Sequence, residues 1–285
     1  MRKFILFGIF FCLFVSQTFA VNYALSFDGY DDFVEILNNN NSLSLTAMTV
    51  EAWVKASPGG SVGRVVYKNA ARTGNSDNYT LNVGNNSAPY FHIEEAVGDR
   101  DYSVTSTVSA TSTQWMHIAG VYDGNQMRIY INGMLDNTIT IGSQALYQGA
   151  ENLFLGTDRF SNHGGYPVGQ IPRNSYSGLI DEVRIWNIAR TDQQIAENYN
   201  KTISGTTTGL VGYWNFDEAL DSQTVLDLSG NNNHGVLGLS TLSAADDPAR
   251  VLSDITIVPE ASTWVFLLFG LYAFMMQKRY KNHKF

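Results

Sequence analysis

The stretch WMHIAGVYDGNQMRIYING, residues 115–133, decides the fold class of this chain. Apolar residues recur in strand-like fashion over residues 115–122 and again over 127–131, as in strands that bury one face. Asp123-Gly124 and Asn132-Gly133 follow these two runs, and such pairs are typical of tight hairpin turns because both positions tolerate a positive φ. The stretch therefore predicts two antiparallel strands, followed by a third strand over residues 135–141.

Short runs of the same kind continue on both sides of this stretch, from Tyr23 to about Leu239, separated by Gly, Asn and Asp. Turn signals about every ten residues are typical of antiparallel sandwiches and barrels. One helix is predicted after a capping box, with Thr191 at the N-cap and Gln194 at the third helical position. We expect this helix to run to Tyr199 and to close one end of the sandwich.

The charge of the chain is distributed unevenly. Its 285 residues carry 18 Lys and Arg against 26 Asp and Glu, a formal net charge of −8. The first 20 residues hold two bases and no acid, and the tail from Val258 holds four bases and one acid, so residues 21–257 carry −13. An acidic body repels a phosphate backbone, which excludes nucleic acid as a partner. A hydrophobic content of 44% with 15% charged residues also excludes a disordered chain.

The two ends of the chain predict export and retention. Residues 1–20 combine two basic residues, an apolar run and small residues before Ala20, which is the pattern of a secretory signal peptide. The single cysteine, Cys12, lies in this apolar run, so the exported body has neither disulfide nor thiolate chemistry. Residues 261–276 form a C-terminal membrane segment that is shorter than the roughly twenty residues of an unstrained span. The bases behind it stay on the cytoplasmic side.

A short motif precedes this membrane segment. Its residues are Val258, Pro259, Glu260, Ser262 and Thr263. With the apolar run and the basic cluster that follow, it resembles the PEP-CTERM sorting signal of Gram-negative bacteria, although Ala261 replaces the usual second proline. The resemblance implies an exosortase-type processing enzyme at the inner membrane, and a plain membrane anchor is the alternative. We expect export, transient or stable anchoring by the sorting tail 253–285, and final location at the cell surface or in the extracellular matrix.

Five segments of the body carry a second resemblance. They are ALSFDGYDDFV (24–34), MTVEAWV (48–54), WMHIAGVYDG (115–124), IYING (129–133) and GLIDEVRIWN (178–187). In this order they resemble the LamG-like jelly-roll family of the concanavalin A-like lectin and glucanase superfamily. The resemblance implies an all-β fold, a concanavalin A-like jelly-roll sandwich of two antiparallel sheets with one short helix. It also implies binding of sugar or protein, commonly with calcium.

We expect one LamG-like jelly-roll domain over residues 21–252. Residues 210–239 resemble a segment that often precedes the opening strand in this family, but here they follow the domain. They are either the start of a second copy or a permuted strand segment of the same domain. A second copy would need more than about a hundred residues, and too few remain before the tail. Since sandwich termini often lie close together, a permuted strand segment is the expected arrangement.

The turn DGYDD, residues 28–32, offers the hard oxygen ligands that calcium prefers. In the superfamily a structural Ca²⁺ often bridges an early strand and the late signature strand. The resemblance therefore implies Asp28, a carbonyl near Gly29 and Asp181 as ligands. An Asp-Gly turn with a capping carboxylate is the alternative. The run 227–235 is also rich in Asp, Asn and Gly, and we favour a tight turn there over a second ion.

Residues 158–177 form the longest stretch without periodicity, and long loops on compact folds usually carry function. Aromatic faces and planar polar groups bind sugars, and this loop supplies both. The expected ligand contacts are Arg159, Asn162, His163, Tyr166 and Tyr176. The strand aromatics are expected to fill the core instead, and His117 to be structural. These aromatics are Trp53, Trp115, Trp186 and Trp214.

The chain contains no recognisable catalytic motif. The glucanases of the superfamily place their carboxylates as Glu-x-Asp-x-Glu on one strand face, whereas Glu94 and Glu95 are adjacent and would point to opposite faces. Sialidase, Gly-x-Ser-x-Gly and His-Glu-x-x-His motifs are absent as well. We therefore predict a non-catalytic binding protein that recognises polysaccharide or a surface protein. A polysaccharide-active glycoside hydrolase or lyase with an unrecognised site is the alternative.

Overall fold

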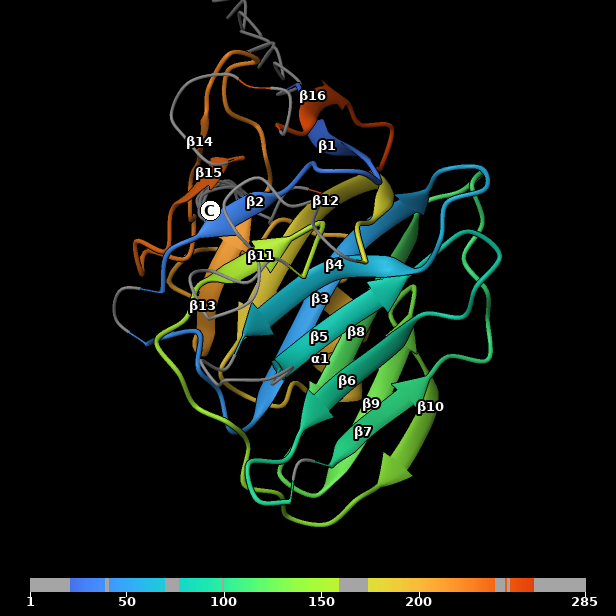
Figure 1. Cartoon of the computed structure of the whole chain (residues 1–285), viewed down its shortest axis with the longest axis vertical. Helices are drawn as coiled ribbons and strands as arrows, with labels where there is room; N and C mark the ends of the chain where they lie inside the picture. Colours follow the sequence, from blue (N-terminus) through green and yellow to red (C-terminus); the bar gives the residue numbers. More distant parts are fainter. Residues whose placement is uncertain are drawn as a thin grey trace, which may run out of the picture.

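The alternating strand runs of the sequence assemble into two sheets that pack face to face (Figure 1). The computed structural model describes residues 21–38, 41–69, 77–98, 100–158, 174–238, 244 and 247–258. Every pair of neighbouring strands in these residues is antiparallel. The predicted all-β jelly-roll sandwich is confirmed.

The first sheet, which we call sheet A, contains the predicted hairpin and the late signature strand. Its order is β10-β9-β8-β3-β12-β1-β16, and β13 pairs with the second half of β12. The strands are β1 (Tyr23–Asp28), β3 (Met48–Ala56), β8 (Met116–Tyr122), β9 (Gln126–Ile131), β10 (Met134–Thr140), β12 (Ser177–Trp186), β13 (Leu210–Trp214) and β16 (Ala249–Leu252).

The second sheet, sheet B, has the order β14-β15-β2-β11-β4-β5-β6-β7. Its strands are β2 (Val34–Ile36), β4 (Gly63–Asn69), β5 (Asp77–Val83), β6 (Tyr90–Glu94), β7 (Asp101–Thr105), β11 (Leu153–Leu155), β14 (Thr224–Val225) and β15 (Gly235–Leu237). The inward side chains of the two sheets form one hydrophobic core. Because successive side chains of a strand point to opposite faces, the residues between these core positions face outward.

The predicted hairpin strands correspond to β8, β9 and β10 within one residue at each end. The turn between β9 and β10 has φ values of 48° at Asn132 and 80° at Gly133. Both values are positive, as a two-residue hairpin turn requires. The Asn132 side chain also accepts a hydrogen bond from the amide of His117 at 2.9 Å, which ties the turn to β8.

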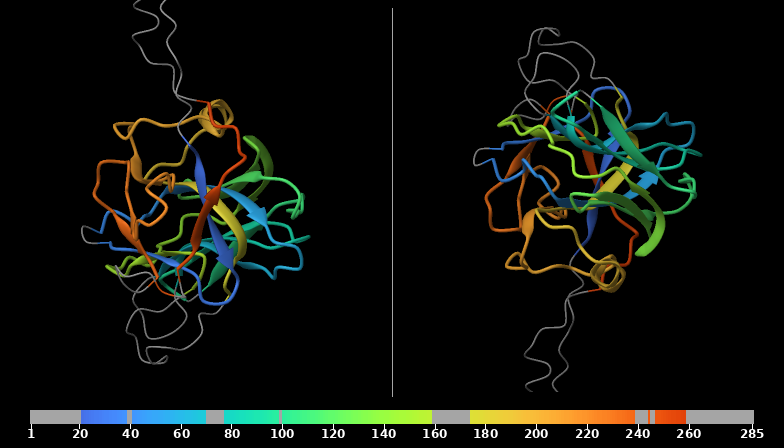
Figure 2. Two further views of the ribbon diagram at one scale, coloured as in Figure 1. Left: turned by 90° about the horizontal axis from the view of Figure 1, so that it is seen from above. Right: turned by 90° about the horizontal axis from the view of Figure 1, so that it is seen from below.

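The predicted helix α1 spans Asp192–Asn198 and begins at the expected capping box. Thr191 Oγ1 accepts the Gln194 amide at 3.2 Å, and Gln194 Oε1 accepts the Thr191 amide at 2.9 Å. The expected position of the helix was wrong. Instead of closing an end, α1 lies on the outward face of sheet A, where Ile195 packs against β8 and β9 (Figure 2). α1 buries a single side chain, Ile195, so a small apolar patch on the face of the sheet is enough to hold it.

Residues 210–238 contribute strands to both sheets. β13 pairs with β12 in sheet A, while β15 pairs with β2 and with β14 in sheet B. The turn between them is held by Asp227, whose carboxylate accepts hydrogen bonds from the amides of Tyr213, Ser229 and Asn233 and from the Ser229 hydroxyl. These four bonds hold the Asp227 carboxylate in place in the turn.

The described chain begins and ends on sheet A. β16 pairs with β1, and the Ser253 amide donates to the Asn22 carbonyl at 2.9 Å. Val258 forms a parallel bridge with Lys201. The expected signal peptide 1–20 and membrane segment 261–276 lie outside the described residues, as do Pro259, Glu260, Ser262 and Thr263 of the sorting motif. No helix among the described residues is long and apolar enough to cross a membrane.

Candidate functional site

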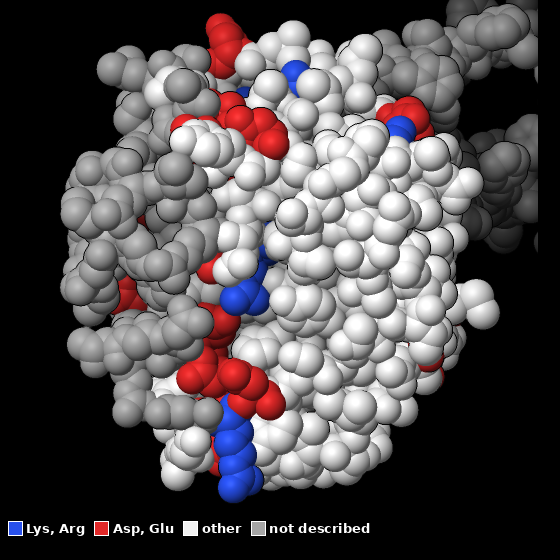
Figure 3. All heavy atoms as spheres, turned by 45° about the vertical axis from the view of Figure 1, so that its right-hand side comes forward, with Lys and Arg blue, Asp and Glu red and all other residues white. Residues whose placement is uncertain are grey.

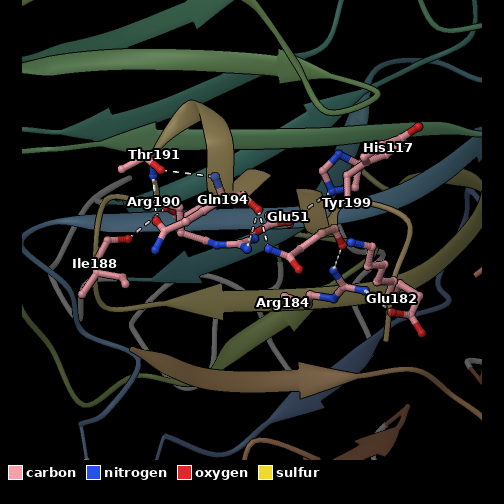
Figure 4. A network of polar contacts seen from close by, with 12 residues as sticks. Glu51, His117, Glu182, Arg184, Ile188, Arg190, Thr191, Gln194 and Tyr199 are labelled. Carbon is pink, nitrogen blue, oxygen red and sulfur yellow. Dashed lines mark hydrogen bonds and ion pairs between the residues drawn. The ribbon is translucent and has the colours of Figure 1, made fainter. Parts of the chain in front are cut away.

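Residues 187–202, which include α1, cover part of the outward face of sheet A, and a buried network of charged groups lies beneath them (Figure 4). We call this the closed face. Glu51 on β3 is fully buried, and its two carboxylate oxygens contact the guanidinium of Arg190 and Nε2 of His117, the latter at 3.2 Å. Arg190 also donates to the Gln194 carbonyl at 2.9 Å. The network thus connects β3 to the helix.

A second part of the closed face is centred on Arg184. Its guanidinium forms an ion pair with Glu182 and donates to the carbonyls of Asn198 at 3.1 Å and Lys201 at 2.6 Å. Glu182 in turn accepts the Tyr213 hydroxyl at 2.9 Å. Arg184 therefore satisfies carbonyl oxygens at the C-terminal end of α1, where a positive charge is favourable.

The electrostatics of the closed face point to a structural role. Burial would raise the pKa of Glu51, but the charge of Arg190 and the contact with His117 outweigh it and hold this pKa at about 2. Burial lowers the pKa of His117, whose side chain is only 1% exposed. The charged groups pair with one another, and their side chains are at most 4% exposed.

The outward face of sheet B is different, because its polar side chains extend to an open edge. We call this the polar face and define it by Arg64 and Tyr67 on β4, Asp77, Thr80 and Asn82 on β5, His92 on β6, and Asp101 and Ser103 on β7. The side chains on β4 and β5 are largely buried, whereas Asp101 and Ser103 on the edge strand are exposed. In the view of Figure 3 acidic and basic side chains lie together in one band, further acidic side chains lie at the top and the right, and most of the remaining visible surface is uncharged.

Arg64 organises the buried half of the polar face. Its Nη1 donates to Asn82 Oδ1 at 2.9 Å and to Thr80 Oγ1 at 3.1 Å, and its Nη2 lies 3.5 Å from Asp77 Oδ2. The guanidinium carbon lies 5.6 Å from the centre of the Tyr67 ring. A planar cation, an amide, a carboxylate and an aromatic ring thus come together on two adjacent strands.

His92 organises the open half. Its Nδ1 lies 3.0 Å from the Ser103 hydroxyl oxygen, because the register of β6 and β7 places these two residues directly opposite each other. Its Nε2 lies 3.5 Å from Asp101 Oδ1 and 4.0 Å from Asp77 Oδ2. The imidazole therefore lies between a hydroxyl on one side and carboxylates on the other.

Burial shifts the pKa values of the polar face toward the neutral forms. It lowers the pKa of His92 to about 4, and Asp101 offsets only part of this effect. Burial raises the pKa of Asp77 to about 6 despite the neighbouring charge of Arg64. Burial together with Asp77 also raises the pKa of Tyr67 well above its ordinary value. At neutral pH the face therefore presents a neutral imidazole beside the mostly ionised carboxylate of Asp77.

The predicted calcium turn forms an acidic loop at the end of β1. The carboxylates of Asp28, Asp31 and Asp32 offer oxygens that lie within 4.8 Å of one another, and no other three His, Cys, Asp or Glu side chains of the described residues come this close together. Burial and the neighbouring acids raise the pKa of Asp32 to about 6, offset in part by the Asp28 amide, which donates to it at 2.7 Å. Gly29 has a φ of +83°, and a Cβ there would lie 2.7 Å from that of Ser177. These carboxylates suit a cation such as Ca²⁺.

The third expected calcium ligand, Asp181, lies elsewhere. Asp28 pairs with Ser177, so Asp181 lies four residues farther along β12, outside the acidic loop. Its Oδ1 accepts the Glu182 amide at 2.7 Å, and burial raises its pKa well above the ordinary value. Glu182 has a φ of +52°, and the register of β12 with β3 shifts at this point. The structure thus joins Asp28 to Asp31 and Asp32, not to Asp181.

The expected ligand loop is described only in part. Arg159, Asn162, His163 and Tyr166 lie outside the described residues. Tyr176 is buried in the main core, where its ring packs edge-on against Phe27 at 6.3 Å between centroids. Tyr176 therefore offers no exposed ring for a sugar, and its expected contact is corrected to a packing role.

Two of the four strand tryptophans fill buried positions, as expected. Trp214 lies in the main core, and Trp186 lies in a smaller cluster with Tyr213. The other two are partly exposed on the outward face of sheet A. Trp53 stacks on Tyr199 at 6.0 Å between ring centroids, and the Trp115 indole donates to Asp254. They hold the covering segments in place.

Sequence reasoning missed the polar face altogether. Thr80 and Asn82 alternate with the apolar Tyr79, Leu81 and Val83 on β5, and Tyr90 and His92 alternate with Phe91 and Ile93 on β6. This alternation of polar and apolar residues marks one outward polar face. This alternation could have predicted the polar face from the sequence, but it does not reveal which polar residues of neighbouring strands lie opposite each other.

Comparisons with known proteins agree with this architecture. The family model Laminin_G_3, described as the concanavalin A-like lectin/glucanases superfamily, matches residues 28–196. Pappalysin-1 from Mus musculus is 25% identical over 191 residues, and pappalysin-1 from Homo sapiens is 26% identical over 190 residues. These matches cover 61% and 60% of the chain but only 11% of either pappalysin.

Two solved structures share the fold at low identity. One is a protein of Bacteroides ovatus provisionally assigned to carbohydrate binding, with a TM-score of 0.55, 17% identity and coverage of 79% of this chain and 61% of that one. The other is the native heptameric SAP-like pentraxin of Limulus polyphemus, with a TM-score of 0.52, 16% identity and coverage of 78% and 97%. The chain belongs to the concanavalin A-like lectin/glucanases superfamily.

Proposed function

We propose that this domain binds polysaccharide through the polar face of sheet B. The observation that carries the proposal is the contrast between the two outward faces. The closed face is filled by its own ion pairs, whereas the polar face combines a guanidinium, an amide, a carboxylate and an imidazole beside an open edge. Sugar hydroxyls are paired donors and acceptors, and planar polar groups of this kind bind them bidentately.

The structural neighbour from Bacteroides ovatus supports a carbohydrate ligand, since it shares the sandwich over most of this chain. The acidic body supports a ligand other than nucleic acid. A surface protein is the other partner expected from the sequence, but the polar face has few exposed apolar side chains of the kind that form the centre of protein interfaces.

A glycan array probed with the full-length protein tests the proposal. We expect binding to one or more polysaccharides, and at least a tenfold weaker affinity for Arg64→Ala. The matched control is Arg128→Ala on β9 of sheet A, because Arg128 also pairs with an aspartate and its side chain is 20% exposed against 14% for Arg64. Absence of binding to all glycans, or equal loss in both variants, would overturn the proposal.

We also propose that the acidic loop binds a structural Ca²⁺. Asp28 and Asp31 are at least partly open to solvent, so a cation can reach them while Asp32 lies beneath. Bound calcium would offset the repulsion among the three carboxylates, which share the small space beside Gly29 and Ser177. The ion would fix the end of β1 next to β12 and so stabilise the rim of the sandwich.

The expected location at the cell surface is also proposed for this protein. Export through residues 1–20 and retention through the tail 253–285 would place the sandwich outside the inner membrane, where polysaccharide is available. Fractionation of cells that produce the full chain, or a chain ending at Val258, tests this. We expect the full chain in the membrane or matrix fraction and the shortened chain in the soluble exported fraction. Identical fractionation of both would contradict the role of the tail.

A further inference from the structure

Three adjacent strands of the polar face bring a hydroxyl, an imidazole and carboxylates into contact. Ser103 Oγ lies 3.0 Å from Nδ1 of His92, and the other ring nitrogen lies 3.5 Å from Asp101 and 4.0 Å from Asp77. A hydroxyl on one imidazole nitrogen and a carboxylate on the other is the arrangement that activates a serine nucleophile. In the usual serine, histidine and aspartate arrangement, Nε2 contacts the hydroxyl and Nδ1 contacts the carboxylate. Here Nδ1 faces the hydroxyl and Nε2 faces the carboxylates.

The other two histidines in the described residues lack this arrangement. His117 contacts Glu51 through Nε2, but its Nδ1 has no hydrogen-bond partner and the ring is buried. Nδ1 of His234 accepts the Asp227 amide at 3.0 Å. His92 is therefore distinguished by its hydroxyl partner and by its position next to an exposed edge strand, where a substrate can approach.

The protonation state of His92 suits a general base. Burial lowers its pKa to about 4, so the ring is neutral at pH 7, and the tautomer that carries its proton on Nε2 has a lone pair on Nδ1 for the Ser103 proton. The charged groups that face it from the neighbouring strands are Asp101, Asp77 and Arg64. Asp101 favours the protonated ring, and Arg64 opposes it. The imidazolium that forms during a reaction is thus stabilised mainly by the carboxylate of Asp101.

We propose that Ser103 and His92 form a nucleophile and base pair that hydrolyses acyl esters carried on polysaccharide bound at the polar face. The proposed binding of polysaccharide determines only which molecule carries the ester, and the roles of Ser103 and His92 do not depend on it. An ester is the suitable substrate because its carbonyl is more reactive than that of an amide. A weakly basic imidazole on a partly exposed strand can provide only moderate activation.

The reaction balances with water as the co-reactant. Ser103 Oγ forms a bond to the acyl carbon while its proton passes to His92 Nδ1, and the bond from that carbon to the sugar oxygen then breaks. The sugar oxygen takes the proton from His92 and leaves as an alcohol. Water attacks the acyl-serine, gives one proton to His92, and the carboxylic acid departs as Ser103 Oγ regains that proton. Asp101 acts as a positioning residue that holds the ring and its charge.

The test uses the full-length protein, p-nitrophenyl acetate and a fluorophosphonate probe, neither of which requires glycan binding. We expect ester turnover and labelling of the peptide that contains Ser103, and loss of at least about 100-fold in turnover in Ser103→Ala and His92→Gln. The matched control is Thr105→Ala, which removes a hydroxyl two residues along β7 that lies opposite Tyr90 rather than a histidine. Thermal melting verifies that the variants are folded.

The role of Asp101 has its own readout. Asp101→Asn removes the charge that raises the pKa of His92, so the acid limb of the pH–rate profile should move to lower pH as the rate falls. A residue with a merely structural role would lower the rate without moving the limb. An unchanged limb would contradict the positioning role of Asp101.

The substrate arm compares acetylated xylan with the same xylan after chemical deacetylation. Release of acetate by wild type and Thr105→Ala, but not by Ser103→Ala, is the expected result. Absence of turnover and labelling in wild type, or turnover that survives in Ser103→Ala, would overturn the inference even if glycans bind. Turnover of p-nitrophenyl acetate without binding to any glycan would instead support the serine site and overturn the proposed polysaccharide ligand.

Discussion

The closed face and the polar face are built from the same kinds of residues, yet they differ in how completely those residues satisfy one another. On the closed face Glu51, His117 and Arg190 are at most 4% exposed, and the charges form pairs beneath α1. On the polar face Arg64 is 14% and His92 12% exposed, and Asp101 is 74% exposed. An acid, a histidine and an arginine therefore hold α1 on the closed face, whereas the same residue types form a candidate binding surface on the polar face. Burial and covering segments decide between the two outcomes.

The largest expected effect is a loss of stability on the closed face. Glu51→Ala leaves Arg190 buried without its carboxylate, and breaking a buried pair in this way costs about 3–5 kcal/mol. Asp101→Ala removes an exposed acid from the polar face and should change stability by less than about 0.5 kcal/mol. Urea denaturation at pH 7 measures both values. Similar losses in the two variants would refute the distinction between the faces.

Two carboxylates, Glu51 on the closed face and Asp77 on the polar face, should respond to pH in opposite ways. The pKa of Glu51 is about 2 in the folded protein, below its ordinary 4.5, so its contribution to stability is present above pH 4.5 and is lost as the pH falls toward 2. The pKa of Asp77 is raised from 3.8 to about 6, so its contribution is present below pH 4 and is lost as the pH rises through 6. His92 counteracts Asp77 on the same face, because its pKa is lowered from 6.5 to about 4 and its contribution is lost as the pH falls through this range. Variants are therefore needed to isolate the effect of Asp77.

Denaturation midpoints from pH 3 to pH 8 test this opposition. Asp77→Asn should remove part of the decline between pH 4 and pH 7, by at most about 3 kcal/mol, because a shift of one pKa unit corresponds to 1.36 kcal/mol. Glu51→Gln should flatten the acidic limb and leave that decline in place. A decline that is unchanged in Asp77→Asn would show that other acids govern it.

Removal of calcium should have a smaller effect that is confined to the acidic loop at the end of β1. If the acidic loop binds Ca²⁺, a concentration one hundred times the dissociation constant stabilises the fold by about 2.7 kcal/mol relative to chelator. Asp28→Asn should abolish this difference. The matched control, Asp123→Asn, alters another Asp-Gly turn whose carboxylate also accepts backbone amides, at 2.9 and 2.7 Å. Melting curves with Ca²⁺ and with EDTA measure the effect, and a wild-type curve indifferent to chelator would refute the calcium proposal.

The fold could be predicted from local patterns because its decisive features are local. The turn at Asn132 and Gly133 and the capping box at Thr191 each lie within a few residues of chain, and both formed as expected. The face on which α1 packs was not predictable in this way. It depends on Ala119, Val121 and Tyr130, which come from other strands and become neighbours of Ile195 only after folding.

The candidate sites depend even more on register. His92 and Ser103 face each other because β6 and β7 pair without a shift, and a slip of one residue would place the hydroxyl on the opposite face. Asp181 illustrates the converse, since the pairing of Asp28 with Ser177 places it far along β12 from the acidic loop. Cross-strand register is a property of the whole sheet, and no short motif in this chain encodes it.

A small effect is also expected at the helix that covers part of the closed face. Thr191→Ala removes the side chain that accepts the Gln194 amide, and loss of such a cap costs about 1 kcal/mol. Thr191→Ser keeps the accepting oxygen and should cost much less. Both variants should bind glycans and hydrolyse esters as wild type does, because α1 lies on sheet A and the polar face on sheet B. A cap variant that weakened glycan binding without unfolding would show that the closed face supports the site through the core, and the two faces would then have to be treated as one coupled structure.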